Sequence, residues 1–247
     1  MIRVVRVLLA AAAAGFAVLA YAYVTLPDVR PLRTSNPSTT AFIELRADEA
    51  RARGEQPKRV QRWVSYAHLP PDLKRAVLIA EDDAFWTHEG VDFEQLQESL
   101  QLDWRRGRLV RGASTITQQL AKNLYLSPSR NPVRKLRELV IARRLEAELK
   151  KARILELYLN EIEWGDGIYG AEAASRAYFH KPASDLSAPE AALLAGAIVN
   201  PRLMNPEHPT RRLLQRQQLI LRRMGAVSPP PAEVPAQVTE AKPPRLQ

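Results

Sequence analysis

The spacing of apolar residues along the chain predicts a mainly helical protein. Apolar side chains recur three and four residues apart, the period of one helix face, over several long stretches. We expect helices at residues 72–85, 91–109, 114–126, 133–164, 171–179, 187–199 and 210–225. Residues 42–59 begin as a short strand or helix and continue as a charged loop. No strand pattern is strong and no internal repeat is present, so the pattern favours a helical domain.

Polar residues mark where several of these helices begin and end. Ser114 is placed to cap the start of its helix, and Ser187 with Glu190 has the spacing of a capping box. The charged pair at residues 150–151 predicts a break within the longest stretch, which gives two helices. Residues 164–170 read WGDGIYG, a composition typical of a turn-rich loop.

The N-terminal part of the chain has the pattern of a membrane anchor. Residues 7–27 carry no charge, and a membrane-spanning helix needs about 20 predominantly apolar residues. Tyr21 and Tyr23 lie near the far end of this run, where interfacial aromatic residues are enriched. Arg3 and Arg6 favour a cytoplasmic N-terminus, which would place the rest of the chain on the other side of the membrane.

The same segment admits a second interpretation as a cleaved signal peptide. The sequence Ala20-Tyr21-Ala22 resembles a cleavage site. The apolar run is long for a signal peptide and continues past that site, which favours an uncleaved anchor.

The length of the chain, 247 residues, suits one domain with appendages. We expect a cytoplasmic N-terminus at residues 1–6, the anchor at 7–27, a linker at 28–39, the domain at 40–225 and a Pro-rich disordered tail at 226–247.

Composition narrows the classes of ligand. A net charge of +9 attracts polyanions, which include nucleic acids, anionic lipids and diphosphates. The sequence contains no nucleic-acid-binding motif and only 6% aromatic residues, so we expect no nucleic acid partner. The absence of cysteine excludes a disulfide framework and a thiolate metal site.

The first stretch of candidate chemistry is AEDDAFWTHEG, residues 80–90, which follows an apolar run. An acid beside apolar surface is costly to ionise, so Glu81 is either a solvated helix end or a tuned acid or base. Asp82 and Asp83 could simply end the helix. No second histidine lies at ligand spacing from His88, so we expect no metal site, and a structural hydrogen bond is favoured over catalysis for this side chain.

Two further stretches place charged and polar residues on single helix faces. Thr115, Gln119 and Lys122 follow one another at helical spacing, which is typical of a solvated face or of a ligand-binding face. Arg134 and Glu138 lie one turn apart and, taken alone, are interpreted as an ion pair on a helix surface.

Taken in order, several motifs resemble those of family 51 glycosyltransferases, the peptidoglycan transglycosylases that polymerise lipid II. The motifs are EDDAFWTHEG, GASTITQQLAKNLYL, RKLRELVIARRLE, ILELYLNEIEWGDGIYGAEAASRAYF and EAALLAGAIVNP. The resemblance covers roughly residues 40–223, and the stretch WGDGIYGAEAASRAYF resembles the monofunctional enzymes of Gram-negative bacteria. It implies a mainly α, lysozyme-like domain with a large head lobe and a small membrane-proximal jaw, preceded by one transmembrane helix.

The resemblance also implies roles for individual residues. It assigns the catalytic base to Glu81 and the second essential carboxylate to Glu138. It places substrate-binding positions at Asp82, Phe85, His88, Ser114, Thr115, Gln118, Gln119, Lys122, Asn123, Arg134 and Lys135. No cofactor is required, although some family members are stimulated by a divalent metal, and no dedicated metal ligands are expected here.

The implied reaction joins a lipid-linked glycan chain to lipid II at the periplasmic face of the bacterial inner membrane. The implied partners are lipid II, the growing chain, the membrane and proteins of cell-wall synthesis or division. Two alternatives stay open. A lytic, wall-cleaving enzyme could use the same scaffold, and a membrane-anchored scaffold could have lost its activity.

Overall fold

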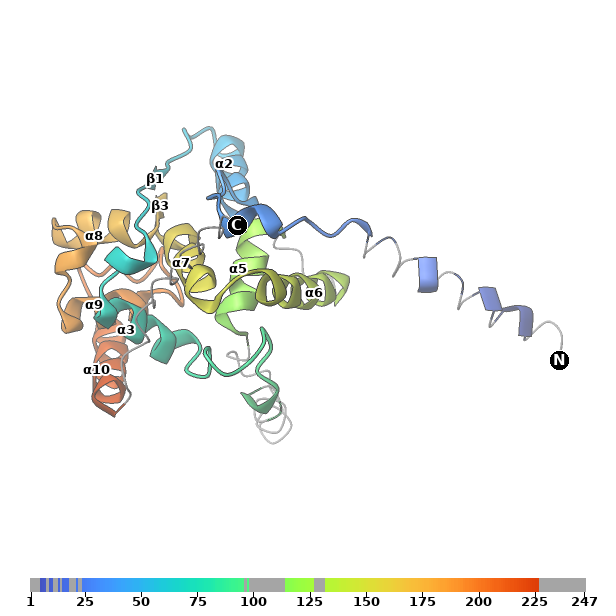
Figure 1. The fold of residues 1–247 in the computed structure, drawn as a ribbon. Helices are drawn as coiled ribbons and strands as arrows, with labels where there is room; N and C mark the ends of the chain where they lie inside the picture. Colours follow the sequence, from blue (N-terminus) through green and yellow to red (C-terminus); the bar gives the residue numbers. More distant parts are fainter. Residues whose placement is uncertain are drawn as a thin grey trace, which may run out of the picture.

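The computed structural model describes residues 25–95, 97, 114–126 and 132–226, together with residues 5–7, 9–10, 13, 15–17, 21 and 24. Helices make up most of this part of the chain (Figure 1). The helical elements are η1 (Arg30–Arg33), α2 (Ala41–Ala52), η2 (Tyr66–His68), α3 (Pro71–Glu81), α5 (Ile116–Tyr125), α6 (Pro132–Glu148), α7 (Lys151–Glu161), α8 (Ala171–Phe179), η3 (Ala183–Asp185), α9 (Ala188–Ala197) and α10 (Arg211–Ala226).

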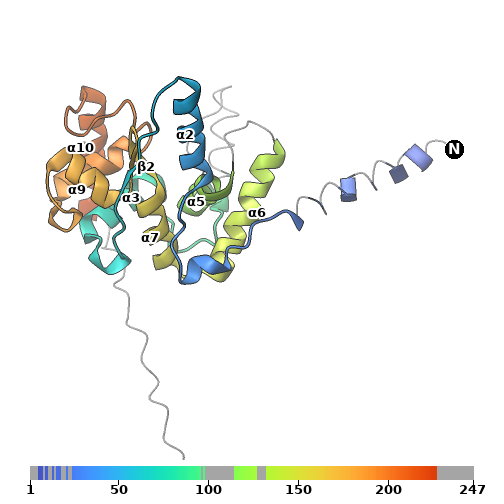
Figure 2. The same ribbon diagram turned by 90° about the horizontal axis from the view of Figure 1, so that it is seen from above.

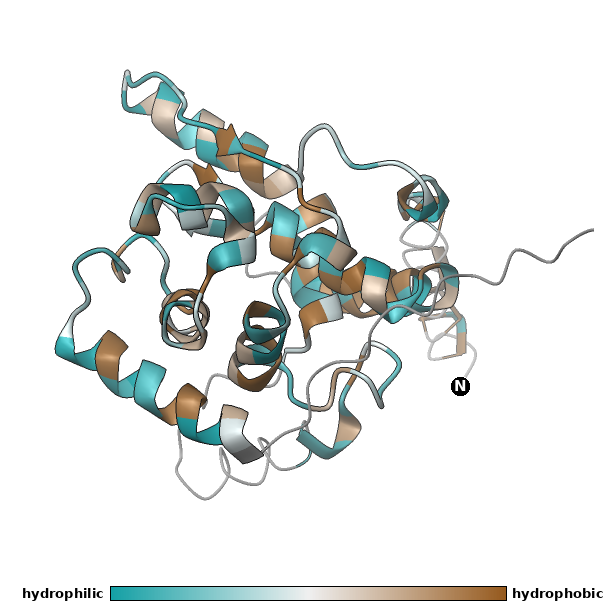
Figure 3. Cartoon of the chain, turned by 60° about the vertical axis from the view of Figure 1, so that its left-hand side comes forward, coloured by the Kyte–Doolittle hydropathy of each residue, from teal (hydrophilic) through white to brown (hydrophobic). Residues whose placement is uncertain are grey.

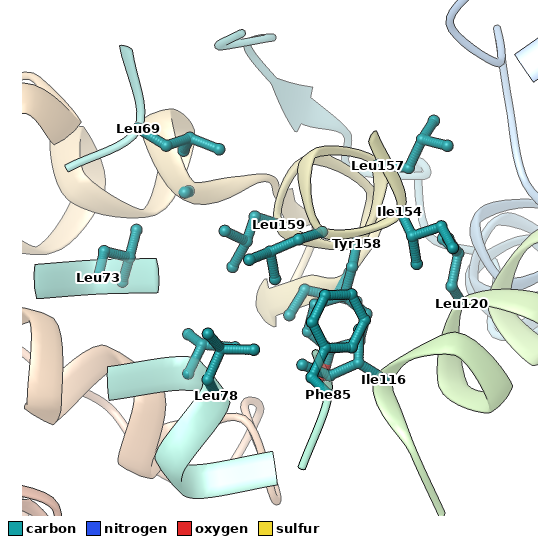
Figure 4. Packing of buried hydrophobic residues seen from close by; sticks show 14 of the residues in the cluster. Leu69, Leu73, Leu78, Phe85, Ile116, Leu120, Ile154, Leu157, Tyr158 and Leu159 are labelled. Atoms are coloured by element: carbon teal, nitrogen blue, oxygen red, sulfur yellow. The ribbon is translucent and has the colours of Figure 1, made fainter. Parts of the chain in front are cut away.

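Helix α7 lies at the centre of the body, where it contacts α5, α6 and α8. Its residues Ile154, Leu155, Tyr158 and Leu159 are fully buried, as Phe85 is beside them (Figure 4). Burying an aliphatic or aromatic side chain contributes about 1.5–3 kcal/mol, so this cluster is a main source of stability for the domain.

Helices α9 and α10 form a second layer against α3. The capping box of Ser187 and Glu190 is present at the start of α9, as the sequence predicts. Helix α10 buries Leu213, Ile220 and Met224 against the body, while its other face is mainly polar but also exposes Leu214 and Leu219 (Figure 3). This amphipathic pattern holds α10 against the layer that carries the end of α3.

A small sheet, which the sequence did not predict, lies beside the helices. Its strand order is β1 (Val60–Gln61), β3 (Ile168–Tyr169) and β2 (Glu163–Gly165), with β1 parallel and β2 antiparallel to β3. The stretch predicted as a turn-rich loop is therefore a hairpin, whose turn includes Gly167 at a φ of 73°. Strands of two or three residues are too short to produce a recognisable alternation.

Several predicted helix boundaries can be compared directly with the structure. The longest stretch does break, because α6 ends at Glu148 and α7 begins at Lys151. The helix predicted to run to residue 85 stops at Glu81, since Asp82 leaves the helical conformation with a φ of −168°. Thr115, rather than Ser114, caps α5, and its hydroxyl accepts from the Gln118 amide at 3.2 Å.

The segment predicted as a linker packs against the body. It contains η1, and Val29 and Leu32 belong to the main hydrophobic core. Part of the predicted anchor (residues 8, 11–12, 14, 18–20 and 22–23), most of the stretch predicted as a helix at residues 91–109, and the tail from residue 227 lie outside the described residues. No helix within the described residues has both the length and the apolar character needed to cross a membrane.

Candidate active site

Glu81 lies at the C-terminal end of α3, where the helix stops. Arg223 of α10 holds this end, because its guanidinium donates to the Ile79 carbonyl at 3.1 Å and pairs with the Asp83 carboxylate. Burial raises the pKa of the Glu81 carboxyl, while the Gln119 hydrogen bond and the nearby Arg216 and Lys122 oppose the rise. A carboxylate in this setting is more basic than a solvated one.

A short relay of hydrogen bonds orients Glu81. Gln119 Nε2 donates to Glu81 Oε2 at 2.9 Å, and Tyr158 Oη donates to Gln119 Oε1 at 2.9 Å. Burial raises the pKa of Tyr158 well above its ordinary value, so the phenol keeps its proton and acts as the donor. The Tyr158 hydroxyl therefore fixes which end of the Gln119 amide faces the carboxylate.

Asp82, unlike Glu81, uses its carboxylate for hydrogen bonds that connect two segments of the protein. This carboxylate is 3% exposed, accepts from the Ile116 amide at 2.8 Å and lies 2.9 Å from His88 Nε2. The Gly90 amide donates to His88 Nδ1 at 3.0 Å, so the proton of the neutral ring lies on Nε2 and points at Asp82. Asp82 and His88 thus join the loop after α3 to the start of α5.

Helix α6 brings a second carboxylate and two cations to the site. Arg134 Nη1 lies 2.9 Å from Glu138 Oε2, and Lys135 Nζ pairs with Glu138 Oε1. Lys135 Nζ also donates to Ser114 Oγ and Gln118 Oε1, each at 3.3 Å, which ties α6 to α5. The Glu138 side chain is only 4% exposed, so this pair of cations compensates an acid that is costly to bury alone.

Lys122 of α5 lies between these two groups. Both Glu81 and Glu138 act on its ammonium electrostatically, as do Arg134 and Lys135. Burial lowers the pKa of Lys122, and within the described residues its Nζ has no hydrogen bond or ion pair. A partly desolvated cation without a partner has unused capacity to bind an anion.

Comparisons with known proteins agree on one family. The family model described as Transglycosylase matches residues 49–225. The chain belongs to the transglycosylase family. It is 46% identical over 196 residues to the biosynthetic peptidoglycan transglycosylase of Laribacter hongkongensis, covering 79% of this chain and 86% of the relative.

Two further relatives carry the same name. The transglycosylase from Azoarcus sp. is 51% identical over 170 residues, which cover 69% of this chain and 74% of the relative. The transglycosylase from Aromatoleum aromaticum is 46% identical over 194 residues, which cover 78% and 84%. The family resemblance drawn from the motifs is therefore confirmed.

The predicted site residues of this transglycosylase differ in burial and in the partners of their polar groups. Among the described residues Lys122 Nζ has no hydrogen bond or ion pair, whereas Phe85, with 0% exposure, lies in the core. Thr115 is also buried and donates to the Gly90 carbonyl at 2.8 Å. Asn123 is 8% exposed. Phe85 and Thr115 are thus both enclosed by the protein.

Two residues near the candidate base were not predicted. Tyr158 orients Gln119 from α7, and Arg216 of α10 acts electrostatically on Glu81. Their helices are far from Glu81 in sequence, so no local pattern could reveal them. Within the described residues, no group of three or more His, Cys, Asp or Glu side chains is placed to hold a metal ion.

Proposed function

We propose that this chain is a peptidoglycan glycosyltransferase that polymerises lipid II and releases undecaprenyl diphosphate. Its place in the transglycosylase family and the names of its relatives support this function. The observation that carries the proposal is the meeting of three helix segments. The end of α3 supplies Glu81, α5 supplies Gln119 and Lys122, and α6 supplies Arg134 and Glu138.

Glu81 suits the role of general base. The attacking group is the 4-hydroxyl of the N-acetylglucosamine of lipid II, and a neutral sugar hydroxyl is a poor nucleophile. A carboxylate held by Gln119 can take the hydroxyl proton as the oxygen bonds to the anomeric carbon of the growing chain. A single displacement inverts that carbon from an α-linked donor to a β-linked product.

The cations suit the leaving group. The bond from the anomeric carbon to the diphosphate breaks, and negative charge grows on the departing oxygens. Lys122 and Arg134 are already in place to receive that charge, which lowers the barrier without reorganisation. Glu138 holds Arg134 and Lys135 in position and is therefore assigned an orienting role.

The proposed setting is the bacterial inner membrane, with one span at residues 7–27 and the catalytic domain in the periplasm. The uncharged run in that segment and the arginines before it support this topology. A lipid-linked substrate meets an anchored enzyme within the plane of the bilayer, which raises the effective concentration of both.

The test uses detergent-solubilised full-length protein and fluorescent lipid II. We expect glycan polymer from the unmodified protein and inhibition by moenomycin, the donor-site inhibitor of the family. Glu81→Gln keeps the size of the side chain but removes the base, so polymer formation is expected to stop while the protein stays folded. Glu89→Gln is the control, because this carboxylate is 78% exposed and pairs only with Arg143 among the described residues.

Two outcomes would refute the proposal. Undiminished polymer formation by Glu81→Gln would remove the assigned base. Breakdown of preformed glycan without polymer formation would instead identify a lytic enzyme, which has no need of the diphosphate-binding cations.

A further inference from the structure

The chain beside the predicted anchor is fixed to the helix that carries half of the active site. Residues 25–36, named here the clamp segment, run alongside α6 before the chain continues toward the N-terminus (Figures 1 and 2). Arg137 of α6 donates through Nη2 to the Thr25 carbonyl at 2.9 Å. At the other end of the helix, Arg33 donates through Nε to the Glu148 carbonyl at 3.0 Å and pairs with its carboxylate.

The clamp segment is also held by the core and by α7. Val29 and Leu32 are 2% and 6% exposed within the main core. Arg153 of α7 donates to the carbonyls of Leu32 and Ser35 at 2.8 and 2.9 Å. A segment with contacts of this kind moves with the body and does not act as a flexible tether.

Arg137 lies within one helical turn of the proposed catalytic groups on α6. Arg134 and Lys135 precede it by one turn or less, and Glu138 follows it directly. A helix advances about 1.5 Å per residue and moves as a stiff unit, so a displacement at Arg137 reaches all three groups. Misplacement of catalytic groups by about 1 Å is enough to slow an enzyme substantially.

We propose that Arg137 is a positioning residue that transmits the position of the membrane anchor to α6. Through the Thr25 carbonyl, it sets the height and tilt of Arg134, Lys135 and Glu138 relative to the bilayer in which the lipid-linked substrate lies. This inference rests on the proposed function and its membrane topology. It assigns to the contact between the clamp segment and α6 a role in catalysis at a membrane, in addition to attaching the domain to its anchor.

The experiment compares polymerisation in two media. Rates are measured with lipid II in vesicles of phosphatidylethanolamine and phosphatidylglycerol, and again in detergent micelles, where no bilayer plane relates anchor and substrate. The variants are Arg137→Gln, a Gly-Ser-Gly-Ser insertion between Val24 and Thr25, and the two combined. The insertion leaves the Thr25 contact in place but uncouples it from the anchor, because such linkers are flexible. Arg222→Gln, an exposed arginine on α10, is the control for loss of one charge.

We expect Arg137→Gln and the insertion each to lower the ratio of vesicle rate to micelle rate about fivefold, a modest value for coupled groups. The combined variant is expected to be no lower than either alone, because both changes break the same connection. Arg222→Gln is expected to match the unmodified protein.

Three results would overturn the inference while leaving the proposed function intact. Arg137→Gln could leave the ratio unchanged, could slow both media equally as a general packing defect would, or could multiply with the loss from the insertion. Absence of polymer from the unmodified protein in both media is a separate result, which would refute the proposed function and the inference together.

Discussion

The relay from Tyr158 to Glu81 predicts that one buried hydroxyl, which does not itself contact Glu81, controls the proposed catalytic base. Tyr158→Phe keeps the ring that fills the core beside Phe85 and removes only the donor to Gln119 Oε1. The Gln119 amide then loses the bond that fixes its orientation. The bond from Gln119 Nε2 to Glu81 becomes less populated, and the carboxylate loses part of its alignment.

The size of the effect follows from the bonds in the relay. An unsatisfied buried acceptor costs about 1–3 kcal/mol, and a typical hydrogen bond contributes about 1 kcal/mol net. If about 1 kcal/mol of this reaches the transition state, the polymerisation rate falls about fivefold. The Gln119 bond also lowers the pKa of Glu81, so weakening it raises that pKa further. Activity that requires the ionised carboxylate therefore begins at higher pH in the variant.

The assay measures the initial rate of lipid II polymerisation across a pH series, with thermal unfolding recorded on the same samples. Tyr178→Phe is the matched control, because its hydroxyl donates to the Trp164 carbonyl at 3.1 Å on another part of the molecule. Both variants are expected to lose about 1 kcal/mol of unfolding free energy. Only Tyr158→Phe is expected to lose rate and to shift the acidic limb upward. Equal rates for the two variants would show that the relay has no part in catalysis.

Three further variants test other parts of the structure. Lys122→Met removes a partly buried cation that has no partner among the described residues. We expect no polymerisation by this variant but, in calorimetry, an unfolding free energy raised by about 1 kcal/mol. An unfolding free energy below that of the unmodified protein would contradict an unpaired ammonium. Burial raises the pKa of Glu161 to about 7, so the folded state binds its proton more tightly and stability should fall by about 2 kcal/mol as pH rises from about 5 to about 8. Urea unfolding of Glu161→Gln at both pH values should lack this difference. If the unfolding free energy of the variant fell with pH as much as that of the unmodified protein, another group would be responsible. Gly90→Ala places a methyl group 3.0 Å from Glu146 Cγ at a φ of 86°, which should lower the urea midpoint by the equivalent of about 2 kcal/mol; an unchanged midpoint would contradict the strain.

Helix periodicity predicted much of the fold because its signal extends over many residues. The break between α6 and α7 and the capping box of α9 were both predicted from local sequence. The small sheet was missed because each strand is two or three residues long. The packing of Val29 and Leu32 was also missed, since a proline-rich polar stretch gives no sign that two apolar residues are held in the core.

The site was predicted unevenly for a physical reason. Gln119 and Lys122 lie near Glu81 and Glu138, as the motifs suggested, because motifs preserve residues that share a helix face. Motif membership did not separate Lys122, which has no hydrogen bond or ion pair among the described residues, from motif residues that are buried in the core. Phe85 matches a motif position yet is fully buried, which only the three-dimensional packing reveals.

The hydrogen bond from the Ile116 amide to Asp82 fastens the start of α5 to the residue that follows Glu81. Lys122, on the same helix, therefore accompanies the base in any small movement of the body. The seam between α5 and α6 is crossed by the two hydrogen bonds of Lys135 and by the bond from Thr117 Oγ1 to Glu146 Oε1 at 2.6 Å. An inhibitor that spans that seam would contact α5 and α6 at once. A single resistance substitution on one helix would leave the contacts of the inhibitor with the other helix intact.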